Sequence, residues 1–542
     1  MQRSLVGSEM CIRDSIYTVN VESKGKNIEV TVDLDRPIPQ EFIGKVGFNL
    51  EFFPGSLFGK PWIMDGQSGI FPQQPNSPLM TTQPNYLHTG NYHDGKQSLA
   101  DMDKLIGKGY SPIVADDIIS EPYAKGRKFT SRPDDPYNKV TIESLSGDLQ
   151  LFDGRMNHNN GWFVLRSNIK PGVTKGAVKW IITPNVVADW MYQPVIQTSQ
   201  IGYHPAQDKE AVIEMDIRDN RKETAQIIRI DADGEKVVKN VTPANWGKFL
   251  RYNYLKVDFT DVKEPGLYKI KYDTSVSPIF RIDNDVYARG VWQPVLEYFL
   301  PVQMCHMRVN EKYRVWHDCC HMDDAQMAPA HNHIDGYDQK EGLSKFKPGE
   351  VVPGVNIGGW HDAGDFDLRI ESQAGESYIL ALAYEAFHPN LDVTSIDQIN
   401  RVTEIHQPDG KNDLLQQVEN GALTVVNGYL ALGRLYRGII CNDLRQYVLL
   451  GDAAAMTDGK IGNEDDRWIF TEDNPGRELS TAAQLAAVSR VLKGFNDTLS
   501  VHCLDIARKV YASTGSGNNR ALFPKVQAAV ELYLTTGEQP YM

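Results

Sequence analysis

Residues 358–387 have the sequence GGWHDAGDFDLRIESQAGESYILALAYEAF, in which a glycine-rich segment with two aspartates runs into a helix-forming stretch. A helix is predicted over residues 375–387 because apolar side chains recur there with a period near 3.6 residues. One face of this helix is predicted to consist of Ile379, Leu382, Ala383 and Ala386.

The same period recurs on both sides of this stretch. Helices are predicted over residues 287–304, 412–436, 480–495, 499–514 and 523–537. Small side chains such as Ala482 and Ala486 recur along them, which permits close packing of helices. Residues 286–542 are therefore predicted to form an all-α domain.

Towards the N-terminus the apolar period changes from 3.6 to 2, which indicates strands. Residues 16–193 are predicted to be a β-rich, sandwich-like domain with long loops, and residues 194–285 an immunoglobulin-like sandwich of short strands. The first of these domains could bind carbohydrate, because sugar rings stack on aromatic faces. The favoured interpretation is instead that its aromatic side chains pack long loops onto a core. These aromatic residues are Phe58, Trp62, Phe71, Tyr86 and Tyr92.

Length and charge limit the possible functions. A chain of 542 residues is expected to hold about three domains at roughly 100–200 residues each. The formal net charge of −14 argues against nucleic acid and anionic membrane as partners. No apolar run is long enough to span a membrane. Residues 1–15 lack the apolar core of a signal peptide and resemble a translated sequencing-adapter artefact, so they are excluded from the prediction.

The paired aspartates suggest hydrolytic chemistry. Asp362 and Asp365 lie three residues apart, separated only by small residues, and could converge on one water molecule. Inverting glycoside hydrolysis needs one carboxylate to deprotonate the attacking water. A second carboxylate can orient that water or tune the pKa of the first. The alternative is a structural role at the start of the following helix.

Residues 194–542 resemble glycoside hydrolase family 9, in the branch with an N-terminal immunoglobulin-like domain. The resemblance does not cover residues 16–190. Weaker support comes from NDLLQQVENG at 412–421 and AVELYLTTGEQPY at 529–541. The main matching blocks are QTSQIGYHP (197–205), LKVDFTDVKEPGLYKI (255–270), FRIDNDVYARGVW (280–292), YFLPVQMCHMRV (298–309), WHDCCHMDDA (316–325) and GGWHDAGDFD (358–367).

This resemblance implies that residues 286–542 form part of an (α/α)6 barrel and that the activity is inverting hydrolysis of β-1,4-glucan. Asp365 would be the general base, and Asp362 would help to hold the nucleophilic water. The family's general acid, a glutamate in a late motif, is expected beyond Met542. The chain is therefore expected to be a fragment that hydrolyses cellulosic substrates poorly, because acid catalysis contributes roughly 10²–10⁴-fold.

The sequence departs from the family pattern in two places. Phe366 to Arg369 replace the string that commonly follows the aspartates, which leaves the substrate preference open. Gln416 and Gln417 replace acidic residues of a family helix. Neither calcium nor an organic cofactor is expected.

A structural zinc site is the predicted metal centre. Cys305, Cys320 and His321 supply sulfur and nitrogen ligands of the kind that zinc prefers, and some members of this branch carry zinc at matching positions. Asp324 is the first choice for the fourth ligand, with His333 or His361 as alternatives, and Cys319 could replace Cys320. Buried free thiols are the competing interpretation.

Two further residues are predicted to bind substrate, Trp316 and His361. The expected partner is a β-glucan polysaccharide or oligosaccharide, and the intact protein is expected to be monomeric and secreted, periplasmic or on the cell surface. An exo-acting β-glucosidase or glucosaminidase of the same family is one alternative to an endoglucanase. A carbohydrate-binding protein without catalysis is another.

Overall fold

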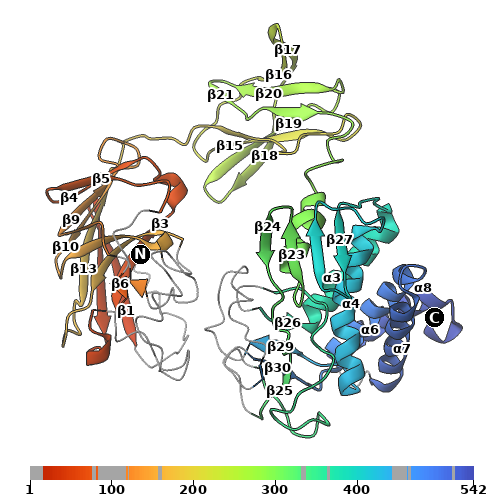
Figure 1. Cartoon of the computed structure of the whole chain (residues 1–542). Coiled ribbons are helices and arrows are strands. Elements are labelled where there is room, and N and C mark those ends of the chain that lie inside the picture. Colours follow the sequence, from red (N-terminus) through yellow and green to blue (C-terminus); the bar gives the residue numbers. More distant parts are fainter. Residues whose placement is uncertain are drawn as a thin grey trace. The chain divides into compact units, whose positions relative to one another are not determined.

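The computed structural model describes residues 16–44, 46–75, 81–82, 118–119, 121–156, 161–330, 337–362, 366–441, 460–461, 466–515 and 519–542. A β-rich N-terminal unit ends at Trp190, and an immunoglobulin-like sandwich and a helical domain follow it (Figure 1). This order confirms the predicted fold class. Among the described residues, no helix has the length and apolar character needed to cross a membrane.

The N-terminal unit is built from two main sheets, ordered β1-β2-β13-β10-β9-β4-β5 and β3-β12-β11-β8. Strand β2 shows why these segments pair: Val30, Val32 and Leu34 alternate into the core between half-buried residues. The strands are β1 (Tyr17–Lys24), β2 (Asn27–Leu34), β3 (Gly47–Phe52), β4 (Pro61–Met64), β5 (Gln67–Ile70), β8 (Ala124–Gly126), β9 (Lys128–Ser131), β10 (Val140–Ser144), β11 (Leu149–Asp153), β12 (Phe163–Asn168) and β13 (Val178–Pro184). A separate pair joins β6 (Thr81–Thr82) to β7 (Ile118–Ile119).

The aromatics of this unit pack inward. Phe71 is fully buried and Trp62 is 6% exposed, while Phe58 is half-buried against the same core. Tyr86 and Tyr92 lie outside the described residues. For the three described residues, the structure therefore supports the core-packing interpretation over an exposed sugar-stacking surface.

The second β unit is a two-sheet sandwich, ordered β14-β15-β19-β18 and β17-β16-β20-β21, with β22 also paired to β20. The hydroxyl of Tyr268 donates to the carbonyl of Glu264 at 2.8 Å, the backward bond of a tyrosine corner. The strands are β14 (Val195–Gln197), β15 (Glu210–Asp216), β16 (Ala225–Asp231), β17 (Gly234–Val241), β18 (Ala244–Phe249), β19 (Tyr252–Asp258), β20 (Gly266–Tyr272), β21 (Ser275–Val276) and β22 (Phe280–Ile282).

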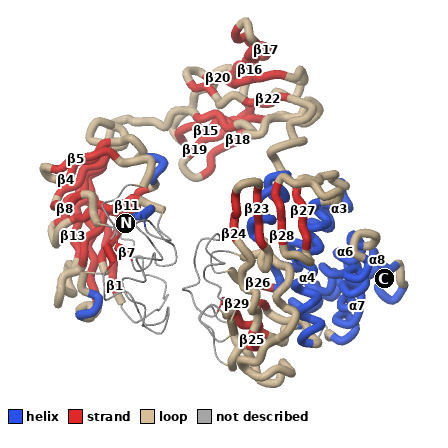
Figure 2. Tube along the Cα trace, viewed as in Figure 1, coloured by secondary structure: helices blue, strands red, loops and turns tan. Residues whose placement is uncertain are grey.

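Helices dominate the C-terminal region (Figure 2). Helix α4 begins where the Asn412 side chain accepts the backbone N–H groups of Leu414 and Leu415, and it ends at Gly433, whose φ is 76°. The long helices are α3 (Ile370–Phe387), α4 (Asp413–Leu432), α6 (Pro475–Leu492), α7 (Asp497–Ser513) and α8 (Asn519–Thr536). The predicted helix over residues 287–304 is reduced to a π-helical turn, Val295–Phe299, and the short α2 (Leu300–Gln303).

The helical domain also contains two small sheets. These sheets were not predicted from the sequence. Their orders are β24-β23-β28-β27 and β25-β30-β29-β26. Strands of two to four residues are too short to show a period of 2 in the sequence. They are β23 (Arg308–Glu311), β24 (Arg314–His317), β25 (Gln326–Met327), β26 (Leu368–Arg369), β27 (Thr394–Asp397), β28 (Val402–Ile405), β29 (Gly438–Cys441) and β30 (Arg467–Phe470).

The predicted buried face of α3 is wrong. Ile379 and Leu382 are 66% and 37% exposed, whereas the small residues Ala374, Ser377 and Ala381 are buried. Helix α3 packs against α4 and α6. Small side chains lie where α3 contacts α4 and α6, because they let the helix axes approach closely. The buried face of α3 is therefore set by side-chain size more than by hydrophobicity.

Candidate functional site

The segment that leads to the paired aspartates is held by side-chain amides from α3 and α4. Gln373 accepts the backbone N–H of Trp360 at 2.8 Å and donates to the Trp360 carbonyl at 2.9 Å. Gln417 accepts the Trp360 indole N–H at 2.7 Å. Asn420 donates to the carbonyl of Gly359 at 3.1 Å. Without these amides, the backbone N–H and C=O groups of this irregular segment would be buried without partners. The amides therefore allow the segment to pass through the core.

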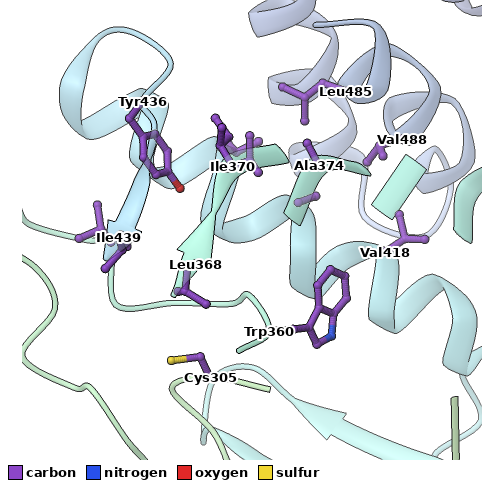
Figure 3. Close-up of a cluster of buried hydrophobic side chains, with 14 of the residues drawn as sticks. Cys305, Trp360, Leu368, Ile370, Ala374, Val418, Tyr436, Ile439, Leu485 and Val488 are labelled. Carbon is purple, nitrogen blue, oxygen red and sulfur yellow. The ribbon is translucent and has the colours of Figure 1, made fainter. Parts of the chain in front are cut away.

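Glycine is required at the start of this segment. Gly358 has φ of 69°, and a Cβ there would lie 2.4 Å from the carbonyl oxygen of Asn420. The backbone therefore passes against α4 too closely for any side chain. Trp360 and Leu368 lie among the buried side chains below the helices, close to Cys305 (Figure 3).

Asp362 begins a closed turn. Its backbone N–H donates to the carbonyl of Asp367 at 3.1 Å, and its carboxylate lies 3.3 Å from Nε of Arg369. The Asp362 side chain is 30% exposed and so remains accessible to water. Asp367 is buried and accepts the backbone N–H of Cys441 at 2.9 Å. Asp365 lies outside the described residues.

Four buried side chains converge beside this turn: Cys305, Cys320, His321 and His361. Their candidate ligand atoms all lie within 4.8 Å of one another. The two sulfurs are 3.9 Å apart, Nδ1 of His321 is 3.7 Å from Cys305, and Nε2 of His361 is 3.4 Å from Cys320. In addition, the buried Nδ1 of His361 has no hydrogen-bond partner among the described residues. Two thiols and two imidazoles buried together are residue types that can hold a metal ion such as zinc.

Asp324, the residue predicted as fourth ligand, lies outside this four-residue group. Its carboxylate accepts from Nε2 of His306 at 2.7 Å and from the guanidinium of Arg467. It belongs to a second candidate group with Cys305 and His306, whereas the alternative, His361, lies in the group with both cysteines. Cys319 also lies apart, with its sulfur 3.8 Å from the carbonyl of Arg401. His333 falls outside the described residues.

The protonation states of Cys305 and His361 suit metal binding. Burial opposes ionisation of the Cys305 thiol, yet the hydrogen bond with Cys320 and the charge of Arg467 hold its pKa well below the usual value. The same hydrogen bond, together with burial, raises the pKa of Cys320. Burial lowers the pKa of His361 to about 4, so its ring is neutral near pH 7. A thiolate and a neutral imidazole are the forms that bind metal.

The two residues predicted to bind substrate have different surroundings. Trp316 is half-buried, and its indole N–H donates to Glu311 at 3.2 Å beneath the guanidinium of Arg314. His361 is 3% exposed and belongs to the four-residue group. The geometry therefore places His361 among candidate metal ligands and not on an open surface.

Sequence reasoning missed Gln373 and Arg467. Both are fully buried polar residues whose partners lie far away along the chain. Neither residue stands out locally, because Arg467 follows Asp465 and Asp466 and Gln373 follows Glu371 and Ser372, so both look like ordinary solvent-facing residues.

Comparison with known proteins identifies two segments. Residues 191–277 match the family described as cellulase N-terminal ig-like domain, and residues 295–542 match glycosyl hydrolase family 9. Endoglucanase D of Acetivibrio thermocellus is 19% identical over 378 residues, covering 66% of this chain and 54% of the relative. A xyloglucan-specific endo-beta-1,4-glucanase of Bacteroides ovatus is 25% identical over 367 residues, covering 64% and 58%. The chain thus spans about half the length of these curated relatives.

Solved structures give matches of the same extent. The Bacteroides ovatus GH9 structure is 19% identical, with a TM-score of 0.45 over 64% of this chain and 62% of that chain. A zinc-binding triple mutant of a family 9 endoglucanase is 21% identical, with a TM-score of 0.46 over 62% and 61%. Residues 295–542 therefore belong to glycosyl hydrolase family 9, and a cellulase N-terminal ig-like domain precedes them.

Proposed function

We propose that this protein takes part in inverting hydrolysis of β-1,4-glucosidic bonds in cellulose or a related β-glucan, as an endoglucanase. The observation that carries the proposal is the water-accessible carboxylate of Asp362, which directly follows a segment whose Trp360 backbone is held by the buried amide of Gln373. An irregular backbone fixed so firmly is typical of a site that must orient a reactant.

The two aspartates have separate roles in this proposal. Asp365 acts as general base and removes a proton from the attacking water. Asp362 accepts a hydrogen bond from the same water and orients it. The Arg369 guanidinium lies 3.3 Å from the Asp362 carboxylate and balances its negative charge. The proton donor to the leaving oxygen is a separate group.

The four-residue group is proposed to hold a structural Zn²⁺ through Cys305, Cys320, His321 and His361. The ion would supply cross-linking of the segments that carry these ligands, and it would not activate water. His361 directly precedes Asp362, so fixing its ring restrains the start of the aspartate turn. A closed Cys₂His₂ set leaves no open coordination position for substrate.

The sharpest test uses an aryl β-cellobioside with a 2,4-dinitrophenyl leaving group, which departs without a proton donor. Hydrolysis then depends on the base alone. The chain should release dinitrophenolate, the first sugar formed should be the α-anomer by NMR, and Asp365→Ala should lower the rate by about 10²-fold or more. Asp505→Ala, an exposed aspartate on α7, is the matched control and should leave the rate unchanged.

Other outcomes distinguish the alternatives. Release no faster than in buffer, together with binding of soluble β-glucan, would favour a non-catalytic carbohydrate-binding protein. A β-anomer as first product would exclude inversion. Comparison of cello-oligosaccharide products from longer substrates separates endo from exo action. The intact protein is proposed to be secreted or held at the cell surface, where such polysaccharides occur.

A further inference from the structure

Arg467, the first residue of β30, is a fully buried cation with several acceptors. Its guanidinium donates to both carboxylate oxygens of Asp324, to the carbonyl oxygen of Phe366 and, at 3.1 Å, to the sulfur of Cys305. The Arg467 side chain is 0% exposed and that of Asp324 is 1% exposed. One guanidinium therefore joins a candidate metal ligand to the backbone that follows Asp365.

A simple ion pair does not explain this arrangement. The Asp324 carboxylate is shared between Arg467 and His306, whose Nε2 lies 2.7 Å from it. The remaining guanidinium N–H groups are directed to Phe366 and Cys305, neither of which is a carboxylate. The planar fork of arginine can serve three such acceptors in one plane, whereas an ammonium group cannot.

The Phe366 backbone needs an anchor. Its φ is 57°, a left-handed conformation that a bulky residue rarely adopts. Its ring is buried and lies with its centroid 4.8 Å from that of His361 and 5.7 Å from that of His321. Strained residues persist where surrounding contacts over-determine them, and they cluster at active sites. Here those contacts are two candidate metal ligands and Arg467.

We propose that Arg467 is a positioning residue for the aspartate turn: by holding the Phe366 carbonyl, it fixes the backbone that continues from Asp365 and couples it to the buried Cys305 group. The inference rests on the proposed function of the aspartates. It adds a residue from about 100 positions further along the chain, on a different strand.

The test compares Arg467→Lys with Arg490→Lys in the whole chain. Lysine at 467 keeps the charge beside Asp324 but cannot reach all three acceptors. Arg490 is the matched control, because it pairs with Glu385 and Glu531 in the same domain away from the turn. The readouts are hydrogen exchange of a peptide spanning residues 358–370, the cobalt–thiolate charge-transfer band after Co²⁺ loading, and kcat and KM on the activated cellobioside.

Arg467→Lys should exchange faster in that peptide and shift the cobalt band, because the N–H to the Cys305 sulfur is lost. It should lower kcat about 10- to 100-fold with KM little changed, as expected for a misplaced reacting group. Arg490→Lys should lower the melting temperature without any of these three effects. If the two variants behave alike in all three readouts, Arg467 is only structural and the proposal is wrong.

Misfolding of the variant and inactivity of the unmodified chain can each be distinguished from failure of this proposal. Should Arg467→Lys fail to fold, the double variant Arg467→Met with Asp324→Asn removes both buried charges at similar volume and is expected to give the same three changes. Should the unmodified chain not hydrolyse the cellobioside, the proposed function fails. Hydrogen exchange and the cobalt band would still decide whether Arg467 holds Phe366 and Cys305.

Discussion

The side-chain amide of Gln373 pairs with both backbone polar groups of Trp360, accepting its N–H at 2.8 Å and donating to its carbonyl at 2.9 Å. One side chain on α3 thus satisfies both backbone hydrogen-bonding groups of Trp360, as a neighbouring strand would in a β-sheet. The pair fixes the backbone two residues before Asp362, where the chain forms an isolated β-bridge with Met304 and not an extended ladder.

Replacing Gln373 by methionine keeps the length of the side chain and removes both hydrogen bonds. We expect the free energy of unfolding to fall by about 2–4 kcal/mol, because a buried N–H and a buried C=O each lose their partner at about 1–3 kcal/mol. Urea unfolding followed by circular dichroism at 222 nm measures this. Gln539→Met, at an exposed position, should change little; equal effects of the two variants would contradict the interpretation.

Two helical glycines should respond to alanine with opposite signs. A Cβ at Gly421 would lie 2.2 Å from the hydroxyl of Ser377 and 2.3 Å from the ring of Trp360, so Gly421→Ala should destabilise by about 1–3 kcal/mol. At Gly375 the nearest atom is a side-chain nitrogen 3.7 Å away, so Gly375→Ala should stabilise by up to about 1 kcal/mol. Thermal melting of both variants checks the signs. Stabilisation by Gly421→Ala would show that there is room for a methyl group between α4 and Ser377, and would contradict the prediction.

Asp413 should make stability depend on pH. Burial raises its pKa to about 7, although the backbone N–H groups of Val393 and Thr394 act in the opposite direction. An unfolded aspartate has a pKa of about 4. Between these values the folded state holds a proton that the unfolded state has lost, so the free energy of unfolding falls as pH rises from about 4 to about 7.

The measurement is a series of urea unfolding curves across this pH range. Asp413→Asn should remove the decline, which amounts to a few kcal/mol at about 1.4 kcal/mol per pKa unit. Asp505→Asn, on the exposed side of α7, should retain it. A decline that survives Asp413→Asn would assign the titration to another group.

Metal analysis tests the zinc site. Protein reconstituted with Zn²⁺ after metal-free preparation should contain about one ion per chain, and a chelator should lower its melting temperature. Cys320→Ser and His361→Asn should each weaken binding strongly. Cys503→Ser, at a buried cysteine on α7 outside the group, should bind zinc normally. Asp324→Asn should also leave one ion bound, whereas loss of the ion would restore Asp324 as a ligand.

The sequence by itself determined the order of the domains and most of the long helices. Apolar period is a local property, so α4 was predicted over residues 412–436, although it ends four residues earlier, before Gly433. The paired aspartates and the Cys305, Cys320 and His321 ligands were also found from spacing and residue type. These predictions needed no knowledge of which segments meet.

Tertiary structure alone decided which partners complete each group. His361 lies in one group with both cysteines, whereas Asp324 lies with Cys305 and His306 and is paired with Arg467, more than 140 residues away along the chain. The packed face of α3 was decided by the room available against α4, where Ser377 fits and a larger side chain does not. Contacts between distant residues and limits on volume arise only once the chain is folded, so no local pattern encodes them.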